Sequence, residues 1–227
     1  MPRIKQVPLA DAHKNAKRHY GALFNGQDPV AHPGTATGTP GHWWTTIALR
    51  PYVFDHAAAG LAMYSGMFCE NGPDSLLCPK ARELAITRTG YAVGSQFVFS
   101  QHCKVSLMAG LEEDKIKAIP HWTVFEGWDT KERAILAYTD AVVLQYGRVP
   151  DALFDALKSE MSDEDIMELT YHITEYVQHA ILCKALRLEY DDVDDRIVEV
   201  PMPGGADFKT WVAEQGLDLK STKAEQR

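Results

Sequence analysis

Apolar residues in the middle of the chain recur at intervals of three or four, which is the spacing of one face of an α-helix. Pro79 suits the first turn of a helix and Gly94 suits a left-handed helix end, so we predict a helix between them. A second helix is predicted over 96–109, with Gly110 as its left-handed cap. On this second helix, His102 projects from a mostly apolar stripe.

Two further helices are indicated by their starting residues. Asp129 and Glu132 have the spacing of a capping box, in which each side chain satisfies a backbone N–H of the other residue. Ser162 is a suitable N-cap for the longest apolar pattern, which continues to about Leu188. The second half of the chain is therefore expected to be helical almost throughout.

The segments outside these helices are less regular. Glycine and proline cluster over 21–41, which predicts a loop, and 43–67 has a helical pattern broken by a proline. The acidic stretch 189–195 lacks the spacing and the glycine of a calcium-binding loop, so it is interpreted as a solvated connector. Strand signals are scarce, and the fold class predicted for the chain is all-α.

The expected organisation is a single domain over residues 1–227. An N-terminal loop and helical extension is expected over 1–78, a helical core over 79–188, and a C-terminal extension over 189–227. With 45% hydrophobic and 24% charged residues, the composition is ordinary for a globular domain that buries a core.

Charge and cysteine content narrow the class of protein. The formal net charge of −8 argues against a surface for nucleic acid or for an anionic membrane, because both would require clustered basic residues. No apolar stretch approaches the roughly 20 residues that cross a bilayer, and the N-terminus does not have the pattern of a secretory signal. The four cysteines contain no Cys-x-x-Cys, which favours reduced thiols and a cytoplasmic location.

The chain carries an ordered set of motifs: Arg-Glu-Leu-Ala-Ile-Thr-Arg at 82–88, Gly-Ser-Gln-Phe-Val-Phe-Ser-Gln-His at 94–102, Ala-Gly-Leu at 109–111 and a closing helix pair over 153–186. This set resembles the carboxymuconolactone decarboxylase and alkylhydroperoxidase D family. The resemblance implies an orthogonal bundle of helices that assembles into trimers or hexamers. It also implies a site between the two motif helices and a neighbouring subunit.

The resemblance also indicates which chemistry is retained. The cysteine pair of the peroxidase branch would fall at Ser95 and Val98, so thiol reduction of a peroxide has no nucleophile here. In relatives with a Tyr-Glu-Trp motif, the glutamate would again fall at Val98, so this proton carrier is absent too. The helper glutamate and histidine of the peroxidase branch would fall at Glu83 and His102, and both are present.

These residues suggest acid/base chemistry that needs no cofactor. A histidine on an apolar stripe is favoured in its neutral, basic form, and a carboxylate such as Glu83 would orient its ring. We therefore expect a decarboxylase or another lyase that acts on a small organic acid, lactone or related carbonyl compound. In the alternative interpretation, His102 only satisfies a buried hydrogen bond, and Glu83 is a structural ion-pair partner of Arg82 or Arg88.

A small-molecule substrate would require an apolar surface near the proposed acid/base pair. Phe97, Val98, Phe99 and Trp43 are the candidate substrate-binding residues, because aromatic and apolar side chains line the clefts that bind ring-bearing ligands. The alternative is that these residues simply belong to the hydrophobic core.

A second constellation leaves a different function open. His172, Glu175 and His179 share one face of the longest predicted helix and could bind zinc, iron or manganese in a metal-dependent oxygenase or hydrolase. The face lies opposite the apolar stripe of that helix, and the favoured interpretation is a solvated or subunit-contact face. A non-catalytic ligand-binding member of the family is the third possibility.

Overall fold

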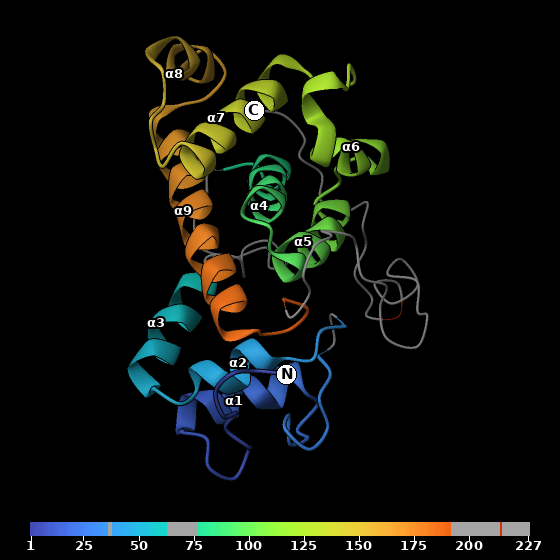
Figure 1. The fold of residues 1–227 in the computed structure, drawn as a ribbon, viewed down its shortest axis with the longest axis vertical. Helices are drawn as coiled ribbons and strands as arrows, with labels where there is room; N and C mark the ends of the chain where they lie inside the picture. The colour runs from blue at the N-terminus through green and yellow to red at the C-terminus, as the bar shows by residue number, and fades with distance from the viewer. Residues whose placement is uncertain (36–37, 63–76, 192–213, 215–227) are drawn as a thin grey trace. The chain divides into compact units, whose positions relative to one another are not determined.

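The computed structural model describes residues 1–35, 38–62, 77–191 and 214, and the regular elements among them are all helical (Figure 1). In chain order they are α1 (Lys14–Leu23), α2 (His42–Ile47), α3 (Pro51–Ala62), α4 (Pro79–Val93), α5 (Gln96–Met108), α6 (Glu113–Ala118), the 3₁₀ helix η2 (Ile119–Val124), α7 (Thr130–Leu144), α8 (Asp151–Lys158) and α9 (Asp163–Leu186). The predicted all-α class is confirmed.

The chain divides into two compact units. Among the described residues, the first unit holds 1–35, 38–62 and 183–191, and the second holds 77–182 and 214. The second unit therefore contains most of the predicted core segment, and α9 ends in the first unit. No helix in the described part of the chain has the length and apolar character needed to cross a bilayer.

Helices α4 and α5 follow from local sequence chemistry. Pro79 occupies the first turn of α4, and Gly94 ends it with a left-handed φ of 73°. The side chain of Ser95 caps α5 by accepting a hydrogen bond from the backbone N–H of Val98, at 3.2 Å. The turn between the two helices is therefore short, and it returns α5 along α4.

A close backbone approach holds α4 against α5. At Gly90, an added Cβ would lie only 2.7 Å from the backbone nitrogen of Phe99 and 2.8 Å from Cγ1 of Val98. Since real Cβ atoms do not approach other atoms this closely, a residue with a side chain would force the helices apart. The missing side chain at Gly90 thus sets the distance between the two helices that carry the predicted acid/base pair.

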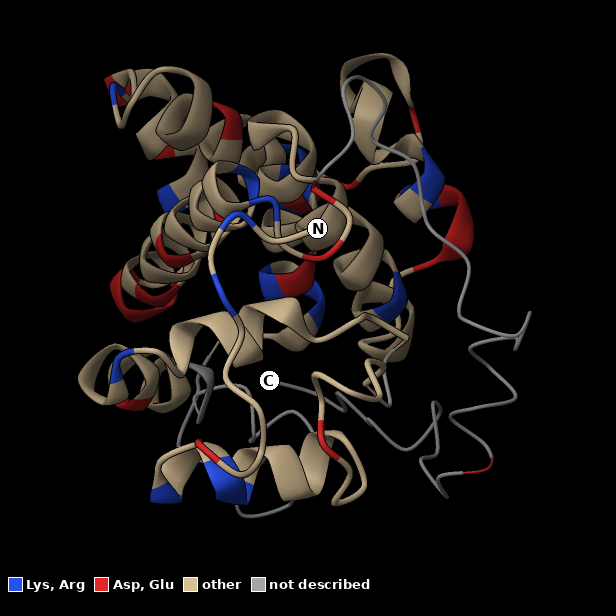
Figure 2. Ribbon diagram, turned by 60° about the horizontal axis from the view of Figure 1, so that its bottom comes forward, with Lys and Arg blue, Asp and Glu red and all other residues tan. Residues whose placement is uncertain are grey.

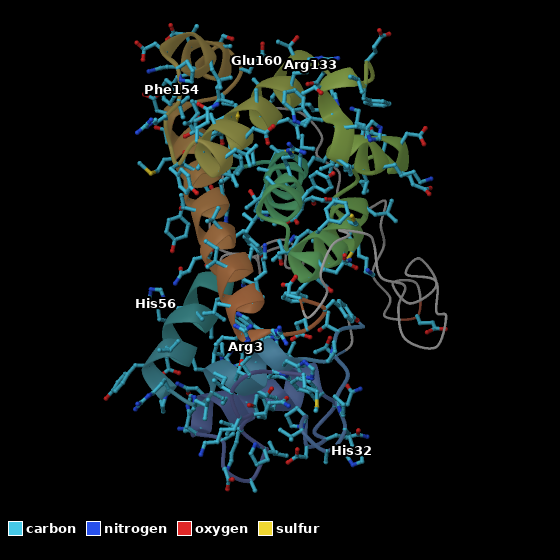
Figure 3. The ribbon with its side chains drawn as sticks, in the orientation of Figure 1. Arg3, His32, His56, Arg133, Phe154 and Glu160 are labelled. Carbon is cyan, nitrogen blue, oxygen red and sulfur yellow. The ribbon has the colours of Figure 1, made fainter. Side chains whose placement is uncertain are left out.

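The starts of α7 and α9 agree with the predictions. Asp129 caps α7, and both hydrogen bonds of the capping box with Glu132 are present. Ser162 caps α9 through a 3.1 Å hydrogen bond from the backbone N–H of Asp165. Arg133 of α7, labelled in Figure 3, also donates to the backbone carbonyl of Phe125 at 2.8 Å.

One hydrophobic core lies within the second unit, where α4 packs against α5 and α7 (Figure 1). An ion pair crosses between α4 and α7, because Arg88 donates two hydrogen bonds to Asp140 at 2.6 and 2.9 Å. Arg88 therefore pairs with Asp140, and Arg82 is the arginine that pairs with Glu83.

Figure 2 shows acidic and basic positions interspersed along the described helices.

The acidic stretch after α9 differs from the prediction of a solvated connector. Glu189 and Asp191 are buried, at 7% and 8% exposure. The carboxylate of Glu189 accepts hydrogen bonds from the backbone N–H groups of Gly41 and Trp43, at 2.9 and 2.7 Å. These donors at the start of α2 explain why a carboxylate can be buried here. Residues 192–195 lie outside the described residues.

The N-terminal region also differs in part from its prediction. Gly21 belongs to α1, so the predicted loop over 21–41 begins later in the chain. Helices α2 and α3 confirm the predicted helical segment as far as Ala62, and 63–67 lie outside the described residues. Arg3, labelled in Figure 3, ties the N-terminus to the end of α9 through the carbonyls of Ala185 and Leu186.

Candidate active site

The structure brings Glu83 of α4 and His102 of α5 into direct contact. Nδ1 of His102 lies 2.7 Å from Oε2 of Glu83. Glu83 is completely buried and His102 is 7% exposed. Because an ionised carboxylate can only accept hydrogen bonds, Nδ1 of the imidazole carries the proton in this contact. The other ring nitrogen, Nε2, takes no part in this contact.

A buried arginine completes the hydrogen bonding of the carboxylate. Nε of Arg82 donates to Oε1 of Glu83 at 3.1 Å, and Arg82 is only 1% exposed. Burial acts to raise the pKa of Glu83. His102 and Arg82 each bring a charge and a hydrogen bond to the carboxylate, and together they outweigh burial and lower the pKa. Glu83 is therefore an ionised carboxylate with both oxygens occupied.

Hydroxyl groups hold the backbone on which this carboxylate sits. Oγ1 of Thr87 donates to the carbonyl oxygen of Glu83 at 2.7 Å and is hydrogen bonded to Oγ of Ser106 at 2.8 Å. Ser106 also donates to the Glu83 carbonyl, at 3.4 Å. Since all of these groups are buried, the position of Glu83 relative to α5 is fixed by hydrogen bonds as well as by packing.

A wall of aromatic rings borders His102, and sequence reasoning did not identify its central member. The ring of Tyr176, on α9, lies 4.6 Å from the His102 ring in a T-shaped arrangement. His179 stacks on Tyr176 at 5.6 Å and also lies 5.6 Å from Phe97. Burial first, and the charge of His102 second, lower the pKa of His179 to about 3. His179 is thus a neutral imidazole near the contact between Glu83 and His102.

The four predicted substrate-binding residues differ in their exposure and in the unit to which they belong. Phe97 is partly exposed, whereas Val98 and Phe99 are buried, at 1% and 5% exposure, and Phe99 belongs to the core cluster. Trp43 is buried in the other unit, where its backbone N–H donates to Glu189. Substrate binding by these residues stays a prediction, and the environment of Phe97 fits it best.

The predicted metal-binding face is buried at His172 and partly exposed at Glu175 and His179. His172 is completely buried, with Nε2 lying 3.4 Å from Oε1 of Glu168 and Nδ1 lying 3.9 Å from Oε2 of Glu175. His179 instead joins the aromatic wall, and Nε2 of its ring is buried. Within the described ranges, no group of three or more His, Cys, Asp or Glu residues is arranged to hold a metal ion.

The positions at which a thiol peroxidase would carry its cysteines have other roles here. Ser95 is the N-cap of α5, and Val98 fills the space beside Gly90. In the described part of the chain, Cys78, Cys103 and Cys183 form no disulfide.

Comparisons with known proteins relate part of this chain to a family and its fold to solved structures. Residues 58–141 match the carboxymuconolactone decarboxylase family. No curated protein matches the chain. Among solved structures, a protein of unknown function from Agrobacterium tumefaciens is 23% identical, with a TM-score of 0.52, and the match covers 63% of this chain and 92% of that one.

Two further structures extend the likeness over more of the chain. An uncharacterized peroxidase-related protein from Ralstonia eutropha JMP134, with an alkylhydroperoxidase AhpD core, is 16% identical with a TM-score of 0.64, over 84% of this chain and 93% of that one. The debrominase Bmp8 in complex with 2,3,4-tribromopyrrole is 13% identical with a TM-score of 0.58, over 94% and 99%. At these identities the likeness is one of fold.

The family match and the shared fold confirm the resemblance found in the sequence. Residues 58–141 thus match the carboxymuconolactone decarboxylase family, on a fold similar to that of an alkylhydroperoxidase AhpD core, and Ser95 and Val98 stand at the positions that the resemblance assigns to a cysteine pair.

Proposed function

We propose that this protein is an acid/base enzyme that decarboxylates a small organic acid, with His102 as the proton carrier and Glu83 as its orienting carboxylate. The observation that carries the proposal is the 2.7 Å contact between the buried Glu83 carboxylate and Nδ1 of His102. The contact orients the ring and leaves Nε2 to exchange a proton with a substrate.

The proposed reaction needs a substrate that can accept an electron pair. In a β-keto or β,γ-unsaturated acid, the bond between the carboxylate and the α-carbon breaks, and its electron pair moves into the carbonyl or alkene. Carbon dioxide leaves, and the resulting enolate or allylic carbanion is protonated on carbon by Nε2–H of the His102 imidazolium. The imidazole then recovers its proton from water, so the cycle closes without an oxidant or a reductant.

Glu83 supports this cycle in two ways. Its ionised form accepts the Nδ1–H of His102 and stabilises the imidazolium that carries the reacting proton, as the carboxylate does in other carboxylate–histidine pairs. Arg82 helps to keep the carboxylate ionised, since its guanidinium lies 3.1 Å from the second carboxylate oxygen. The pair with Arg82 and the pair with His102 therefore work together.

The test compares His102→Ala with the wild-type protein on a panel of small acids. Carbon dioxide release is measured from β-keto acids, β,γ-unsaturated acids and carboxylated lactones. Bromide release from 2,3,4-tribromopyrrole is measured as well, because the structural neighbour Bmp8 is a debrominase. We expect turnover to fall by about 10²- to 10⁴-fold in His102→Ala, the usual contribution of a general acid or base.

His56→Ala is the matched control, because His56 is exposed on α3 and lies in the other unit (Figure 3). Its turnover should equal that of the wild type. A His102→Ala variant that is folded and retains the wild-type rate would refute the assignment of His102.

A trimer or hexamer is proposed as well, on the basis of the family resemblance and of one exposed surface. Met167, Tyr171 and Ile181 share one face of α9 and are 70%, 46% and 54% exposed. Such apolar faces commonly mark protein interfaces. Sedimentation equilibrium tests the assembly, and Tyr171→Glu should shift it toward the monomer.

A further inference from the structure

The imidazole of His102 is restrained at one edge by its hydrogen bond to Glu83. One hydrogen bond fixes the position of Nδ1, but it leaves the ring free to rock about the line that joins Nδ1 to the carboxylate oxygen. Such rocking would move Nε2, the nitrogen on the far side of the ring. A second contact is needed to fix the direction in which Nε2 points.

Tyr176 supplies this second contact from a different helix. Its ring lies 4.6 Å from the His102 ring, with an angle of 81° between the ring planes. This is the edge-to-face arrangement that aromatic rings prefer. Because Tyr176 is on α9 while Glu83 is on α4, the two restraints reach His102 from two separate elements.

Tyr176 is itself held in place by packing. It is 5% exposed, and the ring of His179, one helical turn further along α9, stacks on it with only 16° between the planes. Phe97 of α5 lies 5.6 Å from the far member of this stack, His179. The interface between α5 and α9 is thus a continuous row of four rings, with His102 at one end and Phe97 at the other.

The row contains two imidazoles of different electrostatic character. Burial and the nearby charge of His102 lower the pKa of His179 to about 3, so His179 stays neutral in the working range of pH. The Glu83 carboxylate, by contrast, contacts His102. His179 therefore packs as a neutral ring and does not compete with His102 for the reacting proton.

We infer that Tyr176 is a positioning residue that fixes the ring plane of His102 and so directs Nε2 toward the substrate. The inference rests on the proposed function, because His102 is the group to be positioned. A displacement of about 1 Å at a reacting group can cost on the order of 100-fold in rate, which is why a second restraint matters.

The test measures the ring of His102 by NMR in the full chain labelled with ¹³C and ¹⁵N histidine, without any ligand. The two readouts are the order parameter of the His102 ring C–H bonds and the rate at which Nδ1–H exchanges with water. In Tyr176→Leu, we expect the order parameter to fall and the exchange to become about 2- to 13-fold faster, which corresponds to the loss of an aromatic pair worth about 0.5–1.5 kcal/mol.

Two variants serve as controls. Tyr176→Phe keeps the ring and should leave both readouts at their wild-type values. Tyr138→Leu removes another buried tyrosine ring from the same unit, one that packs near Phe154 at 6.3 Å, and should also leave both unchanged. If Tyr176→Leu does not fold, Tyr176→Met replaces it, because a flexible methionine fills similar space.

The outcomes separate this inference from the proposed function. Wild-type order and exchange in Tyr176→Leu or Tyr176→Met would overturn the positioning role, even if His102→Ala abolishes turnover. A loosened His102 ring in these variants supports the positioning role, even if no acid on the panel is decarboxylated, in which case only the proposed reaction fails.

Discussion

Replacing Glu83 by glutamine removes one charge while keeping the shape of the side chain. The wild-type carboxylate accepts from Nε of Arg82 through one oxygen and from Nδ1 of His102 through the other. A glutamine amide has a single oxygen, so one of these two donors must face the amide NH₂ group. A buried donor that loses its partner costs about 1–3 kcal/mol.

Charge adds to this cost. Arg82 is 1% exposed, and removing one partner of a buried ion pair typically costs about 3–5 kcal/mol because a buried charge is left uncompensated. We therefore expect Glu83→Gln to lower the free energy of unfolding by about 3–5 kcal/mol at pH 7. Urea unfolding followed by circular dichroism measures this difference.

The pH dependence gives the same experiment a second readout. The pKa of Glu83 is lowered from 4.5 in the folded protein, so the carboxylate stabilises the fold fully above about pH 4.5. This contribution is lost as the pH falls through the folded pKa, because a protonated carboxyl, like glutamine, offers one acceptor and one donor. The gap in stability between wild type and Glu83→Gln should therefore narrow below pH 4.5.

A surface carboxylate provides the control for this prediction. Glu112 has a side chain that is 58% exposed and lies 3.8 Å from Nζ of Lys80. Because exposed pairs contribute only about 0–1 kcal/mol, Glu112→Gln should change stability little. A Glu83→Gln variant as stable as Glu112→Gln at pH 7, or a gap that does not narrow in acid, would show that the buried charge network is not what stabilises this site.

Local features at Gly90, Asp129 and Glu189 each affect the stability of the fold in a measurable way. Gly90→Ala should lower stability by about 1–3 kcal/mol by thermal unfolding, since its Cβ would meet the Phe99 backbone, whereas Gly21→Ala, with no atom within 4 Å, should not destabilise the protein. Asp129→Ala should cost about 1 kcal/mol in urea unfolding through loss of the capping box; no change would mean that the cap is frayed in solution. Burial raises the pKa of Glu189 from 4.5 to about 7, so its carboxyl stabilises the fold below about pH 4.5 and this contribution is lost as the pH rises through 7. A Glu189→Gln variant should show a flatter pH profile of thermal stability, and an unchanged profile would contradict the assignment.

The parts of the fold that could be predicted are those set by local chemistry. Gly94, Asp129 and Ser162 mark helix ends correctly because a cap depends on residues within one turn. Gly21 was misleading because glycine is tolerated inside α1 when tertiary packing offsets its low helix propensity.

The parts that could not be predicted depend on partners far away in the chain. Tyr176 approaches His102 across 74 positions of sequence, and no periodic pattern on α9 indicates that contact. From the sequence, Glu189 is predicted to be a solvated acid. Its partners are backbone N–H groups near residue 41, and the residue types there do not indicate that these groups bind a carboxylate. The motif resemblance indicates the pair of Glu83 and His102, but their contact depends on the packing of α4 on α5.

The hydroxyl of Ser95 bears on whether disulfide chemistry could be introduced at this corner. Ser95 starts α5 as its N-cap, and both Ser95 and Val98 are shielded from water at 0% and 1% exposure. Cysteines at these two positions would replace a good helix cap by a poor one and enclose both thiols. Two point substitutions would therefore not suffice, because exposing both sulfur atoms would also demand remodelling of the turn between α4 and α5.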